Sequence, residues 1–122
     1  MAEPRWSQID LAWAAGLFEG EGCIRAATDA QSRGKYAGRL YLDVSQSERE
    51  VLDRFHRIMG FGVVYGPYPK PNRQPYFRYM VSTFERAQQA IILMWPWLST
   101  RRKAQTIAAF RVATTRKGEP AK

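Results

Sequence analysis

At 122 residues the chain is long enough for one domain with a sizeable core and too short for two. Its formal net charge of +8, from 19 Lys and Arg against 11 Asp and Glu, indicates a polyanionic partner or, as the alternative, a generic basic protein kept in solution by its charge. Cys23 is the single cysteine, so an internal disulfide and a thiolate metal cage are excluded. His56 is the single histidine, which disfavours a Ser-His-Asp or Cys-His centre.

The first predicted element is a helix at about Ser7 to Gly20, opened by an S-x-x-D pattern at Ser7 and Asp10. The helix is apolar nearly all round, which is typical of a segment buried on more than one side. Small residues recur at every fourth position on one face, and this spacing predicts close approach by a second helix. These residues are Ala12, Gly16 and Gly20.

Two strands follow, at 23–28 and 39–45, joined by a polar loop at 29–38. The second strand alternates with period two, so that Leu40, Leu42 and Val44 share one face and polar side chains share the other. The apolar face is expected to be buried and the polar face to point outward. The pair predicts a hairpin.

The rest of the chain repeats this order. A capping box at Ser47 to Glu50 predicts a helix at 51–59 that stops at Gly60. Strands are expected at 61–65 and 76–83. The loop between them, at 66–75, is rich in proline, which is expected to keep it from pairing. Helices are expected at 84–94 and 99–114, separated by Pro96, with tails at 1–6 and 115–122.

The resulting order, αββαββαα, predicts a single α+β domain over residues 1–122. Two hairpins, each followed by a helix, can form one four-stranded antiparallel sheet with helices on one face and the other face open to a ligand, and this is the expected architecture. No apolar run reaches membrane-spanning length and the N-terminus lacks a signal-peptide core. We therefore expect an intracellular protein, in the cytoplasm, the nucleoid or an organelle matrix, and no membrane partner.

Two carboxylates, Glu19 and Glu21, fall at the C-terminal end of the first helix, where the macrodipole disfavours acids. Together with main-chain oxygens they are the hard ligands that magnesium or calcium prefers. The alternative is a pair of solvated glutamates in a helix-ending turn, with Gly20 and Gly22 as C-caps. Spacing alone leaves both interpretations open, because a single E-x-E is a weak motif.

The stretch from Ala14 to Gly22 resembles the motif of the LAGLIDADG homing endonucleases. Gly16 and Leu17 match its inner Gly-Leu, Glu19 and Glu21 its two acids, and Gly22 its last glycine, while Ala14 replaces leucine and both acids are glutamates rather than aspartates. One copy is present. The resemblance implies a saddle-shaped sheet and a homodimer in which two motif helices pack side by side. The implied interface comprises Ala12, Ala15, Gly16, Glu19 and Gly20.

The resemblance also implies a divalent metal at the scissile phosphate, Mg²⁺ for catalysis and Ca²⁺ as a non-catalytic substitute. Glu21 and the Gly20 carbonyl are the expected ligands, and Glu19 is expected to support the helix junction. Gln46 matches a polar residue that orders water, or else is only a helix-entry residue beside Ser47. The family's basic residue aligns best with Arg101, with Lys103 as the alternative, and simple contact with the DNA backbone is the other interpretation of Arg101, Arg102 and Lys103.

The open sheet face is the expected DNA-reading surface, since a β ribbon fits the major groove, where arginine binds guanine and an acid accepts from cytosine. The alternative is an ordinary solvated face. Loop cations are expected to contact phosphates rather than bases. The candidates on the face are Arg25, Ala27, Arg39, Tyr41, Asp43, Tyr65, Tyr76, Arg78 and Met80, and the phosphate contacts are Arg33, Lys35, Lys70 and Arg73.

The function that the resemblance implies is a homodimeric, sequence-specific endonuclease. It would make double-strand breaks at a long, nearly palindromic DNA site and serve intron or intein mobility. The alternative is a non-cleaving nucleic-acid-binding protein of the same fold, either an RNA maturase or a DNA-binding regulator.

Overall fold

The elements follow the predicted order, with one short addition. In the computed structural model, residues 5–28 and 38–114 are described. The order is α1 (Gln8–Glu21), β1 (Gly22–Thr28), β2 (Gly38–Gln46), α2 (Arg49–Met59), β3 (Val63–Lys70), β4 (Arg73–Val81), α3 (Phe84–Met94), the 3₁₀ turn η1 (Trp95–Trp97) and α4 (Thr100–Ala113). This confirms the α+β class and the αββαββαα order. The expected loop at 29–38 lies outside the described residues except for Gly38, which begins β2.

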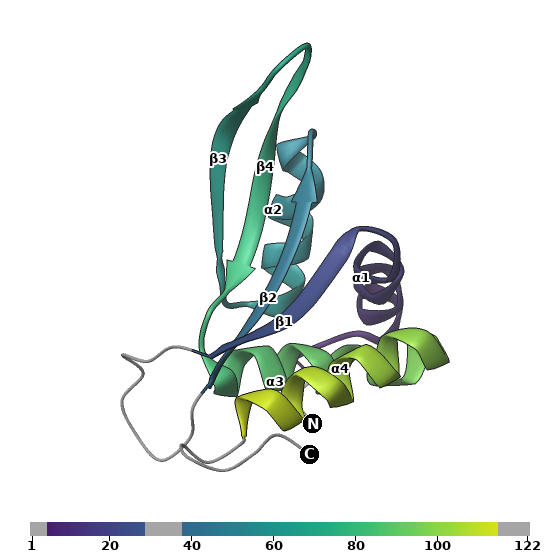
Figure 1. Cartoon of the computed structure of the whole chain (residues 1–122). Helices are drawn as coiled ribbons and strands as arrows, with labels where there is room; N and C mark the ends of the chain where they lie inside the picture. The colour runs from purple at the N-terminus through teal and green to yellow at the C-terminus, as the bar shows by residue number, and fades with distance from the viewer. Residues whose placement is uncertain (1–4, 29–37, 115–122) are drawn as a thin grey trace.

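The four strands form one antiparallel sheet in the order β1-β2-β4-β3, so β2 and β4 join the two hairpins at its centre. Figure 1 shows α2 behind β2 and β4, α1 beside β1, and α3 and α4 near one end of the sheet, while the hairpin of β3 and β4 extends beyond the other strands. Leu40, Leu42 and Val44 are fully buried, as their alternation predicted. They pack into a core with Phe18, Phe55 and other helix residues.

The start of α1 is as predicted, because the Ser7 hydroxyl accepts a hydrogen bond from the Asp10 amide at 3.0 Å. The capping box predicted at Ser47 to Glu50 is wrong. Strand β2 continues to Gln46 and the N-cap is Glu48, whose side chain makes no capping hydrogen bond. Ser47 thus lies one residue before the cap, too early to reach the free amides of the first helical turn.

The proline-rich segment pairs, contrary to expectation. Strand β3 runs to Lys70, and β4 begins at Arg73, with Tyr68 opposite Tyr76 and Lys70 opposite Arg73. Pro67 and Pro69 are tolerated because β3 is an edge strand, where an amide position on the outer side needs no partner, and because the register shifts on both sides of Tyr68. Pro75 lies in the part of β4 that extends beyond the residues paired with β2. The long hairpin carries its cations to the tip of the sheet.

Among the described residues, contacts with the core begin at Trp6, earlier in the chain than expected. Trp6, placed in the predicted tail, is partly buried against the core, and its indole donates a hydrogen bond to the Met59 carbonyl at 3.3 Å. The tail of residues 115–122 lies outside the described residues. Within the described ranges, no helix is both long and apolar enough to cross a membrane.

Candidate functional site

Glu21 is the last residue of α1, and its side chain is exposed. It forms no ion pair or side-chain hydrogen bond with any other residue in the described ranges. Helix α1 leads directly into β1 at Gly22, whose amide donates to the Phe18 carbonyl. A Cβ at Gly22 would lie 2.2 Å from the Phe18 ring, so only glycine permits this abrupt junction. The junction holds Glu21 at the point where the helix meets the sheet.

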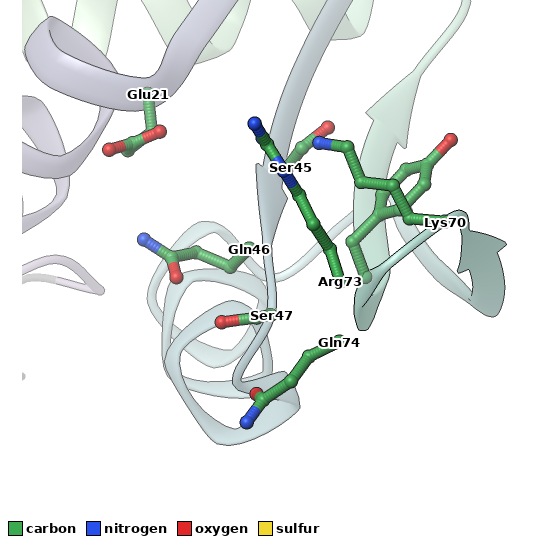
Figure 2. Close-up of a pocket in the computed structure, with 8 residues that line it drawn as sticks. Glu21, Ser45, Gln46, Ser47, Lys70, Arg73 and Gln74 are labelled. Carbon is green, nitrogen blue, oxygen red and sulfur yellow. The ribbon is translucent and has the colours of Figure 1, made fainter.

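Glu21 borders a cavity of about 640 Å³ at this junction. Figure 2 shows Glu21 and Gln46 along one side of the cavity, while the side chains of Lys70 and Arg73 converge toward Ser45. The structure therefore brings Glu21, Gln46 and two of the predicted phosphate-contacting cations into one place. The full lining is Glu21, Ser45, Gln46, Ser47, Lys70, Arg73, Gln74 and Tyr76.

Three of the lining residues were missed by sequence reasoning. Ser45 could have been found from the sequence, because it lies two residues after Asp43 and therefore shares the open face of β2. Ser47 was interpreted as a helix cap, and Gln74 lay within a segment expected to remain unpaired, so neither carried a signal toward the cavity.

One chain supplies few metal ligands. Within the described residues, no three side chains of His, Cys, Asp or Glu lie close enough together to hold a metal ion. Among the residues that the structure describes, Glu21 is the only acid that lines the cavity, and the Gly20 carbonyl belongs to the same last helical turn. These hard oxygen donors are of the kind that Mg²⁺ or Ca²⁺ prefers.

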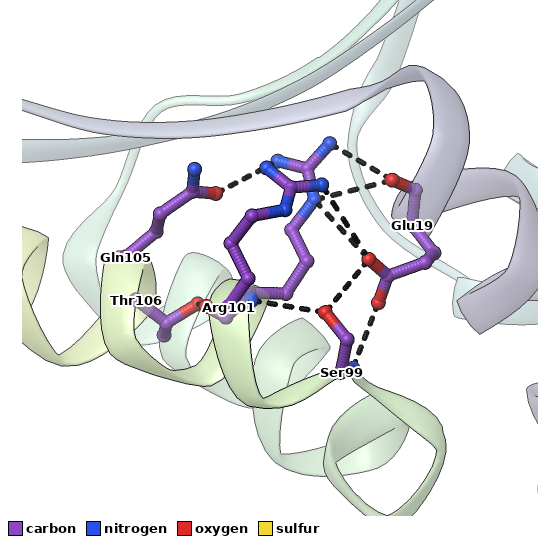
Figure 3. Close-up of polar contacts among 6 residues, drawn as sticks. Glu19, Ser99, Arg101, Gln105 and Thr106 are labelled. Atoms are coloured by element: carbon purple, nitrogen blue, oxygen red, sulfur yellow. Dashed lines mark hydrogen bonds and ion pairs between the residues drawn. The ribbon is translucent and has the colours of Figure 1, made fainter.

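The other acid of the motif has a different role. The Glu19 carboxylate accepts hydrogen bonds from the Ser99 amide at 2.8 Å and the Ser99 hydroxyl at 2.9 Å, and the Arg101 guanidinium lies 3.7 Å away (Figure 3). Ser99 is the N-cap of α4. An acid that is unfavourable at the C-terminus of its own helix thus lies at the N-terminus of another, where the helix dipole favours negative charge.

Arg102 completes this connection. Its guanidinium donates from Nε and Nη2 to the Glu19 carbonyl at 3.2 and 3.0 Å, so that it compensates the C-terminal end of α1. Arg102 is only 8% exposed. Arg102 was predicted to contact the DNA backbone. The structure corrects this prediction, because the Arg102 side chain is buried and binds the Glu19 carbonyl instead.

Loss of the Glu19 carboxylate is expected to loosen α1 from α4. The Ser99 amide, the Ser99 hydroxyl and the two arginines hold the pKa of Glu19 below its ordinary value of 4.5. A lowered pKa stabilises the fold above that ordinary value, and the contribution is lost as the pH falls through the folded-state pKa. We predict that Glu19→Gln lowers the free energy of unfolding by about 1 kcal/mol at pH 7, discounted for solvent screening, and that the difference vanishes in acid.

Urea unfolding of wild type and Glu19→Gln over a pH series measures this difference. Glu48→Gln is the matched control, because the exposed Glu48 side chain forms no capping bond. A stability difference independent of pH would contradict the role of the charge.

The two candidate basic residues do not reach the cavity lining. Arg101 is 64% exposed and pairs with Glu19, and the Lys103 ammonium lies 5.3 Å from the centre of the Trp95 ring. Neither lies among the residues that border the cavity with Glu21. Their predicted catalytic role remains a proposal.

The open face of the sheet is polar, as its alternation predicted. Its side chains are exposed or half-buried, with Arg39 and Tyr65 exposed, and Arg25 stacks over Tyr41 at 4.5 Å. Asp43 is the exception, since it is 7% exposed and paired with Arg78 and Arg25. Asp43 therefore lies on the open face, as expected, but its carboxylate is covered by the two arginines. The half-buried members are Ala27, Tyr41, Tyr76, Arg78 and Met80, and Arg33 and Lys35 lie outside the described residues.

The small-residue face of α1 is bare in the single chain. Gly16 and Gly20 are exposed, Ala12 is half-buried, and a Cβ added to either glycine meets no atom within 4 Å. Ala15 is fully buried in the chain's own core, so its expected place in a subunit interface is corrected. Ile9 also lies on this face and is 81% exposed. The sequence analysis missed it, although its place two helical turns before Gly16 indicates the same face.

Comparison with known proteins rests on structure. No protein-family model and no curated protein matches the chain. Solved structures that match include the homing endonuclease I-CvuI in complex with the I-CreI target and Mg, with 25% identity, a TM-score of 0.65, and coverage of 86% of this chain and 66% of that one. The intron-encoded homing endonuclease I-CeuI, complexed with DNA, has 13% identity, a TM-score of 0.66, and coverage of 89% and 56%.

A third match is the LAGLIDADG meganuclease I-AabMI bound to uncleaved DNA, with 16% identity, a TM-score of 0.64, and coverage of 82% of this chain and 34% of that one. The chain thus spans between one third and two thirds of the length of these proteins. It has the fold of the LAGLIDADG homing endonucleases, which confirms the resemblance predicted from its motif.

Proposed function

We propose that the chain is a homodimeric, sequence-specific DNA endonuclease that makes double-strand breaks at a long, nearly palindromic site with a divalent metal. The observation that supports this most directly is Glu21: an exposed acid with no partner among the described residues, at the end of a helix with a bare outer face. The fold similarity to homing endonucleases, whose solved complexes hold DNA, adds to it. Intracellular action in intron or intein mobility is part of the proposal.

The donor set fits a hard divalent cation. Glu21 and the Gly20 carbonyl of each of two copies would hold Mg²⁺, which supplies charge neutralisation at the phosphate and an acidified water. Calcium is proposed to bind without supporting cleavage, and a related protein, I-CvuI, was crystallised with its DNA target in Ca. Magnesium is therefore the cofactor to test first.

The remaining lining residues have distinct proposed roles. The Gln46 amide both donates and accepts hydrogen bonds, so it orients water beside Glu21. Lys70 and Arg73, whose charged ends converge over the cavity, bind a phosphate oxygen (Figure 2). Arg101 and Lys103, which do not border the cavity in the single chain, are proposed to stabilise charge at the scissile phosphate from α4. Arginine keeps its proton, so Arg101 would act as a fixed charge and not as an acid.

Recognition is assigned to the open sheet face. Arg25, Arg39 and Arg78 present guanidinium donors to base edges, and Tyr41, Tyr65 and Tyr76 add rings and hydroxyl groups. Two copies related by a twofold axis read two half-sites, which is why the target is proposed to be nearly palindromic.

Selection from a randomised duplex DNA pool tests the proposal. Incubation with Mg²⁺ is expected to enrich cleaved molecules that share one nearly palindromic sequence. Enrichment by binding, without cleavage of any member, would instead indicate a DNA-binding regulator, and preference for structured RNA would indicate a maturase. For phosphate contacts, log K falls against log salt with a slope of about −0.9 per neutralised phosphate, so a flat plot contradicts all nucleic-acid functions.

A further inference from the structure

An acid lies at the centre of the positively charged open face. Asp43 is on β2, opposite Cys23 of β1 on one side and Met80 of β4 on the other. A carboxylate at this position repels DNA phosphates and is costly to bury unless it is paired. Its side chain is only 11% exposed, so its charge is largely covered by neighbours.

The neighbours are two arginines from the flanking strands. The Arg78 Nη2 donates to Asp43 Oδ2 at 3.0 Å, and the Arg25 Nε lies 3.9 Å from the same oxygen. Arg25 is opposite Tyr41 and Arg78 is opposite Ser45, so each guanidinium reaches Asp43 diagonally from a different direction along β2. Asp43 Oδ2 therefore attracts both guanidinium groups, whose positive charges would repel each other if the carboxylate were absent.

Both arginines keep donors for a ligand above the sheet. Each guanidinium carries five N–H groups, and the contact with Asp43 uses one edge of each. The side chains of Arg25 and Arg78 are 46% and 31% exposed, whereas that of Asp43 is covered. Arg25 is further restrained by the Tyr41 ring at 4.5 Å. A restrained guanidinium loses less entropy when it binds guanine in bidentate fashion.

We infer that Asp43 is a specificity-determining positioning residue: it reads no base itself and fixes Arg25 and Arg78 as a pair that reads guanine. This inference rests on the proposed DNA-binding function. It differs from the expectation drawn from the sequence, in which Asp43 accepts a hydrogen bond from cytosine.

Asp43→Asn separates the two roles. We expect affinity for random-sequence duplex DNA to rise slightly, because a negative charge is removed, while preference for the selected site falls about tenfold as bidentate contacts loosen. Asp53→Asn is the matched control. It removes the same charge from α2, behind the sheet, and breaks the Arg49–Asp53 ion pair of 3.5 Å, so random-sequence affinity should rise less than in Asp43→Asn and the preference should be unchanged.

Binding is measured in calcium, so that the result does not depend on cleavage. If Asp43 acts through Arg78, Arg78→Lys and Asp43→Asn are non-additive in a double-mutant cycle. Additive effects confined to a C·G base pair would show that Asp43 reads cytosine and overturn the inference. Equal weakening of specific and random-sequence binding would also overturn it, because that result indicates a structural role.

A readout without DNA keeps the two proposals distinguishable. The Nε–H resonances of Arg25 and Arg78 in the free protein are expected to shift or broaden in Asp43→Asn and not in Asp53→Asn. Unchanged resonances overturn the inference whether or not the protein cleaves DNA. A wild-type protein that enriches no sequence contradicts the proposed function itself.

Discussion

Replacement of Glu21 by glutamine is expected to reduce Mg²⁺-dependent cleavage about a thousandfold or more, since metal stabilisation of the reacting phosphate is worth several kcal/mol. Both active centres of a homodimer lose a ligand at once. The fold is expected to be unaffected, because Glu21 is exposed and has no ion pair among the described residues. Site binding in calcium should persist, although weakened, because the sheet supplies most contacts.

Plasmid cleavage by the purified variants measures this effect. Glu85→Gln is the matched control, because Glu85 is an exposed glutamate on α3 that does not line the cavity. Equal cutting by wild type and Glu21→Gln would remove Glu21 from the mechanism. Loss of cleavage accompanied by a lowered Tm would point to a structural role for Glu21 instead.

Gly16→Leu is expected to separate the subunits and abolish double-strand cleavage. The bare face of α1 allows two helix backbones to approach closely, and a leucine there prevents that approach. Within one chain we expect the change to be tolerated, because Gly16 is exposed and a Cβ there meets nothing within 4 Å. Leucine is also the better helix former by about 0.8 kcal/mol, so the stability of the isolated fold should not fall.

Sedimentation of both proteins, with thermal unfolding, tests the interface. Ala108→Leu, on an exposed position of α4, adds a leucine without touching the α1 face and should remain dimeric and active. A wild-type monomer that cleaves both strands would contradict the shared site. A Gly16→Leu dimer with full activity would place the interface on another surface.

Local patterns were sufficient for the order of the helices and strands and for most of the residues that line the cavity. The alternation in β2 correctly separated Leu40, Leu42 and Val44 from the polar face, because the side-chain period of a strand is a local property. The S-x-x-D start of α1 and the glycine stop of α2 were likewise local, since caps involve residues within one turn. The motif located Glu21, but its metal role stays a prediction.

What required the tertiary structure is the partner of each charged group. The Glu19 carboxylate meets Ser99, which is 80 positions away in sequence, and Arg102 is buried against the Glu19 carbonyl instead of facing outward. Asp43 is covered by arginines from two other strands. Period and spacing specify the face of a strand or helix on which a residue lies, whereas an ion pair depends on register and packing between segments distant in sequence.

The sequence by itself therefore determined the order of elements, the buried face of the sheet and the motif at the end of α1. The tertiary structure alone decided that one acid of that motif joins α1 to α4 while the other stays exposed beside the cavity. It also decided that the proline-rich segment pairs, because β3 lies at the edge of the sheet with a strand on one side only, so amide positions on its outer side need no partner.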